Sequence, residues 1–112
     1  MEPGQGGIAR QDRVKVHILT SARADLAEGR DFYDRQAAGL GDYFLDSLFS
    51  DIDSLVLYAG VHRQVFGFHR VLSRRFPWAI YYRTDGPDAV VVYRVLDCRQ
   101  APGKTVAALL GS

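Results

Sequence analysis

The second half of the chain contains three consecutive stretches with the composition of β-strands, and their order limits the folds open to it. Residues 65–73, 76–83 and 89–96 are rich in aromatic and β-branched side chains. The turn formers of residues 84–88 separate the last two stretches, and the short segment 73–75 separates the first two. This spacing predicts three antiparallel strands joined as a meander.

The first half of the chain predicts one strand and two helices. Apolar residues alternate with polar ones over residues 14–19, which is typical of a half-buried strand. A helix is expected to begin with Ser21 as its N-cap and to run to about Ala38, where Gly39 can end it. A second helix that ends near Gly60 is predicted by a stripe of apolar residues at helical spacing, namely Leu45, Leu48, Phe49, Ile52, Leu55 and Val56. The short linker between the helices makes an antiparallel hairpin.

The order strand, two helices and three strands predicts one α+β domain, in which the helix hairpin packs on one face of a four-stranded sheet. The chain of 112 residues is long enough for one core, and its 47% apolar and 24% charged residues are typical of a folded globular protein. We expect a flexible leader at residues 1–11, the domain at 12–100 and a tail at 101–112. The tail is expected to be either one helical turn or disordered.

The second face of the predicted sheet is also apolar, although the hairpin can cover only one face. A short tail hides little of such a face, and exposed apolar patches of this size indicate an interaction site. We therefore expect a protein partner there. Strand alternation places Leu96 toward the helices together with Val90 and Val92. The side chains expected on the open face are Ala79, Tyr81, Arg83, Val91, Tyr93 and Val95.

Positive charge gathers in the second half of the chain, although the net charge is only +1. Residues 1–59 contain six Lys or Arg against ten Asp or Glu, whereas residues 60–112 contain eight against three. This asymmetry favours an acidic partner, unless folding intermixes the two halves. The arginines of the three strands and their edges form either a site for carboxylates and phosphates or a solvated sheet edge. They are Arg70, Arg74, Arg75, Arg83, Arg94 and Arg99.

The sequence contains no recognisable catalytic or metal-binding motif. The single cysteine, Cys98, excludes an internal disulfide and paired-cysteine zinc sites, and it fits a reducing cytoplasm. His17, His62 and His69 lack metal-ligand spacing, so we expect structural roles for them, no metal and no cofactor. His69 remains a candidate acid or base on the open face. No apolar run is long enough to span a membrane.

The chain resembles the RelE/ParE superfamily of bacterial type II toxin–antitoxin toxins, and it is most similar to the ParE-like branch. The resemblance covers residues 14–102 and rests on residues 24–41 (ADLAEGRDFYDRQAAGLG), 74–83 (RRFPWAIYYR) and 90–102 (VVVYRVLDCRQAP). It implies a small cytoplasmic toxin that is neutralised by a cognate antitoxin with an acidic, partly disordered C-terminal segment. With the open face, it points to antitoxin or target contacts at Arg70, Arg74, Arg75, Ala79, Tyr81, Arg83, Val91, Tyr93, Val95 and Arg99.

Members of the superfamily differ in their targets. RelE-type members cut messenger RNA in the ribosome, using basic residues and often a C-terminal tyrosine or histidine. Here Trp78 occupies the position that resembles the arginine of these ribonucleases, and the segment after Arg99 contains neither Tyr nor His. Both departures favour the ParE-type function, which is to bind and poison DNA gyrase. We therefore expect a surface rather than an enzyme, no membrane association and no sequence-specific DNA binding.

Two alternatives remain open at this point. The first is a ribosome-dependent mRNA endoribonuclease whose unorthodox site consists of His69, Arg70, Arg75 and Arg83. The second is a degenerate, non-toxic homologue that is retained because it binds a partner.

Overall fold

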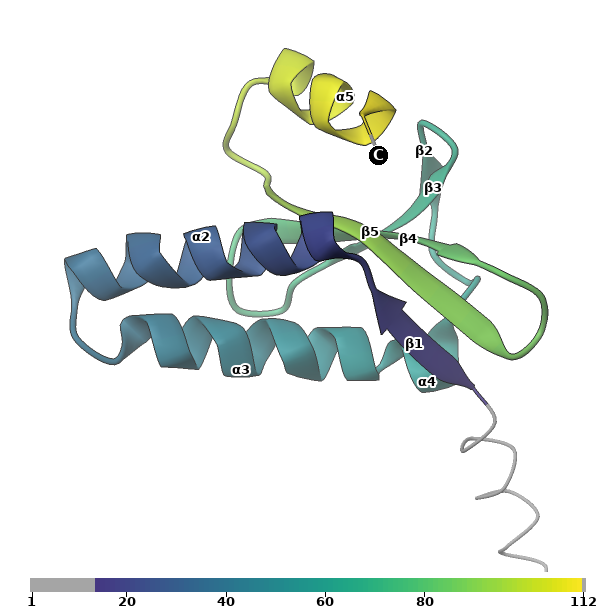
Figure 1. The fold of residues 1–112 in the computed structure, drawn as a ribbon, viewed down its shortest axis with the longest axis horizontal. Helices are drawn as coiled ribbons and strands as arrows, with labels where there is room; N and C mark the ends of the chain where they lie inside the picture. The colour runs from purple at the N-terminus through teal and green to yellow at the C-terminus, as the bar shows by residue number, and fades with distance from the viewer. Residues whose placement is uncertain (1–13, 112) are drawn as a thin grey trace, which may run out of the picture.

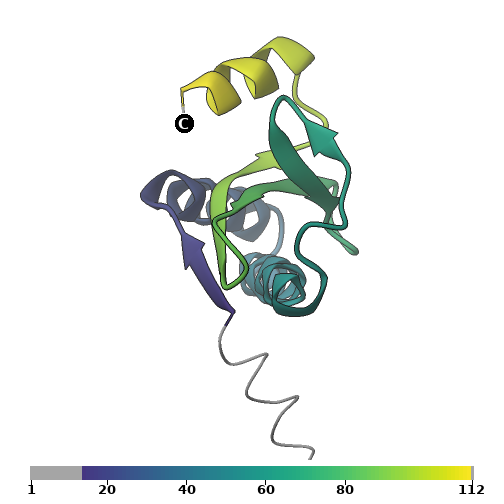
Figure 2. The same cartoon turned by 90° about the vertical axis from the view of Figure 1, so that its right-hand side faces the viewer.

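A five-stranded sheet lies between two layers of helices in the computed structural model, which describes residues 14–111 (Figures 1 and 2). The elements are β1 (Lys15–Ile18), α2 (Thr20–Gln36), α3 (Leu40–Asp53), α4 (Leu55–Tyr58), β2 (Gln64–Val65), β3 (Phe68–Leu72), β4 (Trp78–Thr84), β5 (Ala89–Asp97) and α5 (Pro102–Leu110). The strand order is β1-β5-β4-β3-β2, with β1 parallel to β5 and the other neighbours antiparallel. The leader predicted at residues 1–11 lies outside the described residues.

The predicted α+β architecture of strand, helix hairpin and antiparallel meander is confirmed, but the sheet has five strands instead of four. The additional strand, β2, forms a tight hairpin with β3 through Phe66 and Gly67. Both turn residues have positive φ angles, of 53° and 82°. The two turn residues of such a hairpin are usually Asn-Gly or Asp-Gly. Because Phe66 occupies the position where Asn or Asp is usual, the sequence pattern indicates no turn there and predicts one continuous strand over residues 65–73.

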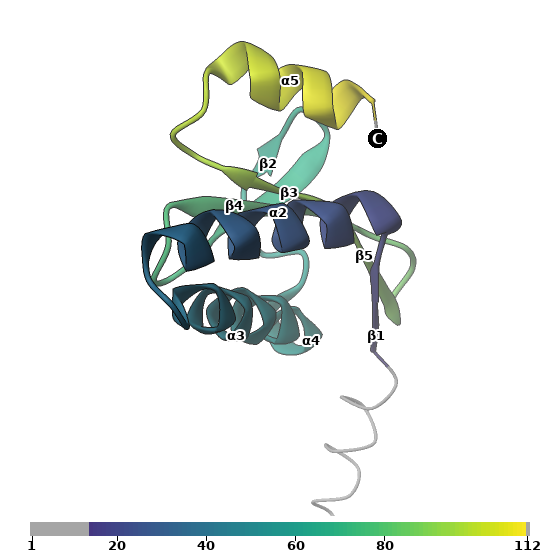
Figure 3. The same cartoon turned by 60° about the vertical axis from the view of Figure 1, so that its left-hand side comes forward.

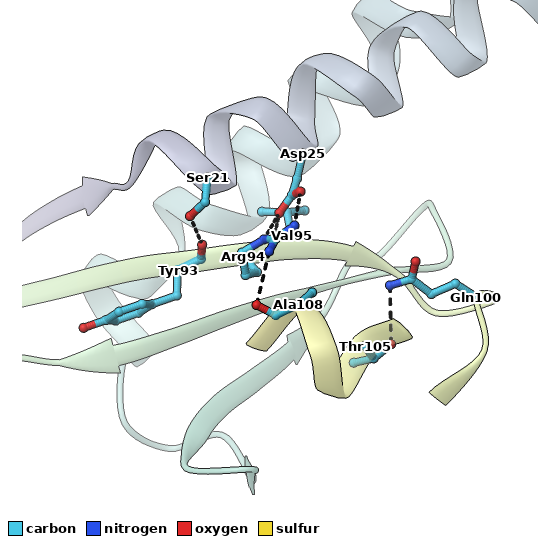
Figure 4. Close-up of polar contacts among 8 residues, drawn as sticks. All are labelled: Ser21, Asp25, Tyr93, Arg94, Val95, Gln100, Thr105 and Ala108. Atoms are coloured by element: carbon cyan, nitrogen blue, oxygen red, sulfur yellow. Dashed lines mark hydrogen bonds and ion pairs between the residues drawn. The ribbon is translucent and has the colours of Figure 1, made fainter. Parts of the chain in front are cut away.

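The α2–α3 hairpin packs closely because a glycine lies at the helix contact. A Cβ atom at Gly29 would lie 2.6 Å from ring atoms of Phe44 and 3.0 Å from the ring of Trp78. Gly39 has the predicted left-handed conformation, with a φ of 86°, but α2 already ends at Gln36 and Gly39 is the N-cap of α3. The prediction for Ser21 is wrong, because its hydroxyl donates to the carbonyl of Tyr93 at 2.8 Å instead of capping α2 (Figure 4).

The main core lies between the hairpin and the sheet. The predicted helical stripe supplies Leu48, Ile52 and Leu55, all at most 1% exposed, but it misses Phe44 and includes Phe49, which is 37% exposed. Within residues 14–111, no helix is long and apolar enough to cross a membrane. The buried members of this core are Ala22, Leu26, Tyr33, Phe44, Leu48, Ile52, Leu55, Trp78, Ile80, Tyr82, Val90, Val92 and Val95.

The second face of the sheet is partly covered by the chain itself, which corrects the expectation of a bare face. The tail forms the nine-residue helix α5 and not a single turn or a disordered segment. Leu109, at 2% exposed, packs with Phe68, Ala79, Tyr81 and Leu96 in a smaller second core. Figures 1 and 2 show α5 on the face opposite the hairpin. The apolar centre of this face therefore belongs to the domain's own core.

A β-bulge in β5 reverses the expected side-chain directions at the end of that strand. The register between β4 and β5 shifts between Tyr81 and Tyr82, and Tyr93 is the extra residue. Beyond the bulge, Val95 is fully buried under the hairpin, whereas Leu96 packs on the α5 side. The predicted placement of Val95 on the open face and of Leu96 toward the helices is therefore wrong in both cases.

Candidate functional site

An arginine held over two aromatic rings dominates the part of the second face that α5 leaves accessible. The Arg83 guanidinium carbon lies 4.0 Å from the ring centroid of Phe68 and 5.2 Å from that of Tyr93. Arg83 Nε also donates to the carbonyl of Gly67 at 3.1 Å. Cation–π contacts and this hydrogen bond fix the guanidinium in place. We call Arg83, Phe68, Tyr93 and Gly67 the Arg83 cluster.

The elements on either side of the Arg83 cluster, β1 and α5, carry basic side chains. Val16 and Ile18 of β1 pack against the hairpin core, so the exposed Lys15 and His17 point to the opposite side, where the cluster lies. α5 contains Lys104 and no Asp or Glu. The Nη atoms of Arg83 bond to no described residue and face solvent. This surface is therefore suited to carboxylates or phosphates.

Arg70 lies on the same face, on the strand next to Arg83. Its Nε donates to the hydroxyl of Tyr81 at 3.1 Å, and its Nη2 lies 3.6 Å from the Sγ of Cys98. Tyr81 is only 4% exposed, because α5 covers its ring. Arg70 therefore borders the footprint of α5, and a partner can reach it without displacing the helix.

The structure does not bring together the four residues of the alternative ribonuclease site. His69 lies on the hairpin side, where its ring stacks on Tyr82 with centroids 5.0 Å apart, and its Nδ1 donates to the carbonyl of His62 at 2.8 Å. The expectation that His69 points to the open face is wrong. Arg75 lies in the β3–β4 connection, exposed and away from the strand positions of Arg70 and Arg83.

The half-buried His62 and the buried Tyr82 form a hydrogen-bonded pair that holds the segment before β2 against the sheet. The Tyr82 hydroxyl accepts from the backbone N–H of Gly60 at 2.9 Å and lies 2.5 Å from Nδ1 of His62. Burial, assisted by repulsion from nearby His69, lowers the pKa of His62. Burial also raises the pKa of Tyr82. Both shifts favour the neutral forms of the two groups in the folded protein.

An ion pair that the sequence analysis missed joins α2, β5 and α5 (Figure 4). Arg94 donates through Nε and Nη2 to the two carboxylate oxygens of Asp25, at 2.7 and 2.8 Å. Its Nη1 donates to the carbonyl of Ala108 in α5 at 3.2 Å, and Asp25 also accepts from the N–H of Val95 at 3.0 Å. Arg94, which was grouped with the functional arginines, is therefore engaged in holding the layers together. The partners are 69 residues apart, so no local pattern reveals them.

A cleft of about 430 Å³ lies between α2, the end of β5 and α5. Arg99 lies on its wall, donating from Nη2 to Asp97 at 2.8 Å, with its guanidinium carbon 5.8 Å from the ring centroid of Phe32. Burial opposes ionisation of Asp97, but hydrogen bonds from Arg99 outweigh it and lower the pKa of that carboxyl. Arg35 and Lys104 also line the cleft. Arg99 also reaches α2, because its Nη2 donates to the hydroxyl of Tyr33 at 3.3 Å.

The described residues supply no evident metal centre. Between residues 14 and 111, no three His, Cys, Asp or Glu side chains gather in a way that could hold a metal ion. The chemistry that the site offers comes from fixed guanidinium groups and aromatic rings, which bind groups of negative charge.

The fold is similar to that of a solved chain from the "Chromosomal ParDE TA system from P. aeruginosa". The TM-score is 0.68, and the two sequences are 17% identical over 76% of this chain and 96% of the other. No protein-family model matches the sequence, and a sequence comparison with curated proteins finds no match. At this identity the likeness is one of fold, and it agrees with the RelE/ParE-like architecture that the sequence resemblance implied.

Proposed function

We propose that this protein is the toxin of a type II toxin–antitoxin system and that a cognate antitoxin with an acidic C-terminal segment neutralises it. The observation that carries the proposal is the guanidinium that the Arg83 cluster fixes on an accessible face, on a fold shared with a chain of a ParDE system. An acidic segment gains charge-assisted hydrogen bonds from Arg83 and Arg70 on this face. The ordering of such a segment costs free energy, which buried apolar contacts must offset.

Of the residues expected to bind the antitoxin or the target, some are accessible and others are not. Ala79 and Tyr81 lie under α5, and Val95 lies under the hairpin. A partner therefore meets the rim of the α5 footprint and not its centre. The accessible members on the face and around its edges are Arg70, Arg74, Arg75, Arg83, Val91, Tyr93 and Arg99.

We propose DNA gyrase as the target, with the toxin acting by trapping the cleaved gyrase–DNA complex. A gyrase poison needs a complementary surface, which the fixed guanidinium and aromatic groups provide. A ribonuclease of the RelE type instead needs groups that activate the 2′-hydroxyl and protonate the leaving oxygen at one point. The separation of His69 and Arg75 from Arg70 and Arg83 argues against that alternative.

Induced expression in a bacterial host tests the toxin proposal. We also expect a small acidic protein, the antitoxin, to be encoded beside this chain. Growth should stop on induction and resume when that acidic protein is co-expressed. Arg83→Glu places a negative charge against an acidic segment and should weaken binding of that antitoxin in a titration. Normal growth on induction, with binding of the neighbouring protein retained, would instead identify a non-toxic homologue. The absence of both effects would refute the proposal.

A further inference from the structure

The turn between β2 and β3 presents an aromatic residue in a conformation that disfavours it. Phe66 has a φ of 53° and is 59% exposed. It is the one non-glycine residue with positive φ in the part of the chain that the structure describes. Bulky side chains rarely adopt this backbone conformation, which Asn, Asp and Gly tolerate far better. Strain of this kind often accompanies a functional constraint.

The rest of the molecule gains nothing evident from the Phe66 ring. The ring belongs to neither apolar core and forms no aromatic pair with any other described residue. Its neighbour Phe68 is 4% exposed and already fills the inward position at this end of the sheet. The fold therefore does not explain an aromatic side chain at position 66.

The turn nevertheless holds Phe66 rigidly beside the Arg83 cluster. Val65 pairs with Phe68 across the turn, and Arg83 Nε bonds to the carbonyl of Gly67. Gly67, with its φ of 82°, completes the two-residue reversal. Figures 1 and 3 show this hairpin rising on the α5 side of the sheet. Phe66 is thus an exposed ring on a preorganised support next to a fixed positive charge.

We propose that Phe66 is the anchor residue for the antitoxin's acidic segment: an apolar side chain of the segment packs on the Phe66 ring while an adjacent carboxylate binds Arg83. This assignment rests on the proposed function and adds the residue that supplies its apolar contact. Aromatic anchors on rigid supports dominate the energetics of protein interfaces, with arginine as a frequent partner. The fixed guanidinium of Arg83, with Lys15 of β1 on the same face, provides the charge complementarity for such a segment.

A single-stranded nucleic acid fits this surface less well. Strand-binding proteins stack successive bases on several exposed rings. Here Phe68 is 4% exposed and Tyr93 is half-buried beneath the Arg83 guanidinium, so Phe66 alone presents a free ring at this end of the sheet. The observations therefore favour a polypeptide with one apolar residue next to carboxylates.

Phe66→Asn separates binding from folding, because Asn suits the positive φ and removes the ring. We expect the variant to melt at the same temperature as the wild type or higher. We expect it to bind the purified acidic protein encoded beside this chain at least about tenfold more weakly in calorimetric titration. Phe66→Tyr, in contrast, should bind this protein with wild-type affinity, since tyrosine keeps the aromatic ring. The matched control is Tyr58→Asn in α4, which removes an equally exposed ring (56%) and should change affinity less than twofold.

Wild-type affinity in folded Phe66→Asn would overturn the anchor assignment while leaving the proposed function intact. The anchor assignment would also be overturned if a single-stranded RNA oligonucleotide bound the wild type more tightly than the acidic protein does and lost this affinity in Phe66→Asn. If the wild-type protein does not bind its neighbour at all, both the proposed function and the anchor assignment fail.

Discussion

Replacing Arg94 by Met tests whether the Asp25–Arg94 ion pair holds the three layers together. The side chains of Arg94 and Asp25 are 22% and 10% exposed, so the pair is largely removed from water. Methionine keeps the apolar stem but removes every donor to the carboxylate except the N–H of Val95, at 3.0 Å. The variant therefore leaves a nearly buried carboxylate with one hydrogen bond.

The expected loss of stability follows from that unpaired charge. Removing one partner of a buried ion pair costs about 3–5 kcal/mol, and the partial exposure of Arg94 places this case near the lower value. At about 4 °C per kcal/mol for a domain of this size, the melting temperature should fall by about 12 °C. The hydrogen bond to Ala108 is also lost, so amides of α5 should exchange with solvent faster than those of α3.

A double variant provides the control for this prediction. Asp25→Asn in the Arg94→Met background removes the stranded charge while its side-chain oxygen can still accept from Val95. Unfolding followed by circular dichroism should show that the double variant is more stable than Arg94→Met alone. A loss below about 1 kcal/mol in Arg94→Met, which is the range of exposed ion pairs, would refute the structural role of this pair.

Three further predictions concern the fold. Gly29→Ala should cost about 1–3 kcal/mol in denaturant unfolding, because the new methyl group meets the enclosed ring of Phe44; unchanged stability would mean that the helices separate freely. Leu48→Asp should abolish cooperative melting, since it buries an unpaired charge at a fully enclosed position, and a retained transition would contradict the helix packing. The lowered pKa of His62 favours its neutral form in the fold, so stability should decline as the pH falls through about 6.5, the unfolded-state value, and below. In melting curves between pH 8 and 5, His62→Asn should flatten this decline, and an equally steep decline would refute the assignment.

Local sequence patterns predict the elements well where one periodicity governs a whole segment. The stripe containing Leu48, Ile52 and Leu55 identifies the buried face of the second helical segment, and Gly39 marks the turn of the hairpin. The meander follows from the composition of its strands and the turn formers between them. These features depend on neighbours within a few residues in the chain, which is the range that periodicity can detect.

The features that shape the candidate site arise from contacts between distant segments. The bulge at Tyr93 moves Val95 to the hairpin core, because one extra residue shifts the alternation beyond it. The helical tail becomes predictable only when the apolar sheet face that receives Leu109 is known. The turn at Phe66 lacks the usual residues. Sequence analysis therefore identifies Arg83 as a surface residue but not the α5 cover that limits what a partner can reach.

The central proposal is that this protein poisons gyrase by binding it through a surface of its own. Purified components test this proposal most directly. The protein is incubated with gyrase, ATP and supercoiled plasmid, and in parallel with ribosomes programmed with messenger RNA. We predict that cleaved plasmid accumulates only when gyrase is present and that the messenger RNA remains intact. Codon-dependent cleavage of the messenger RNA, with no change in the gyrase reaction, would contradict the account.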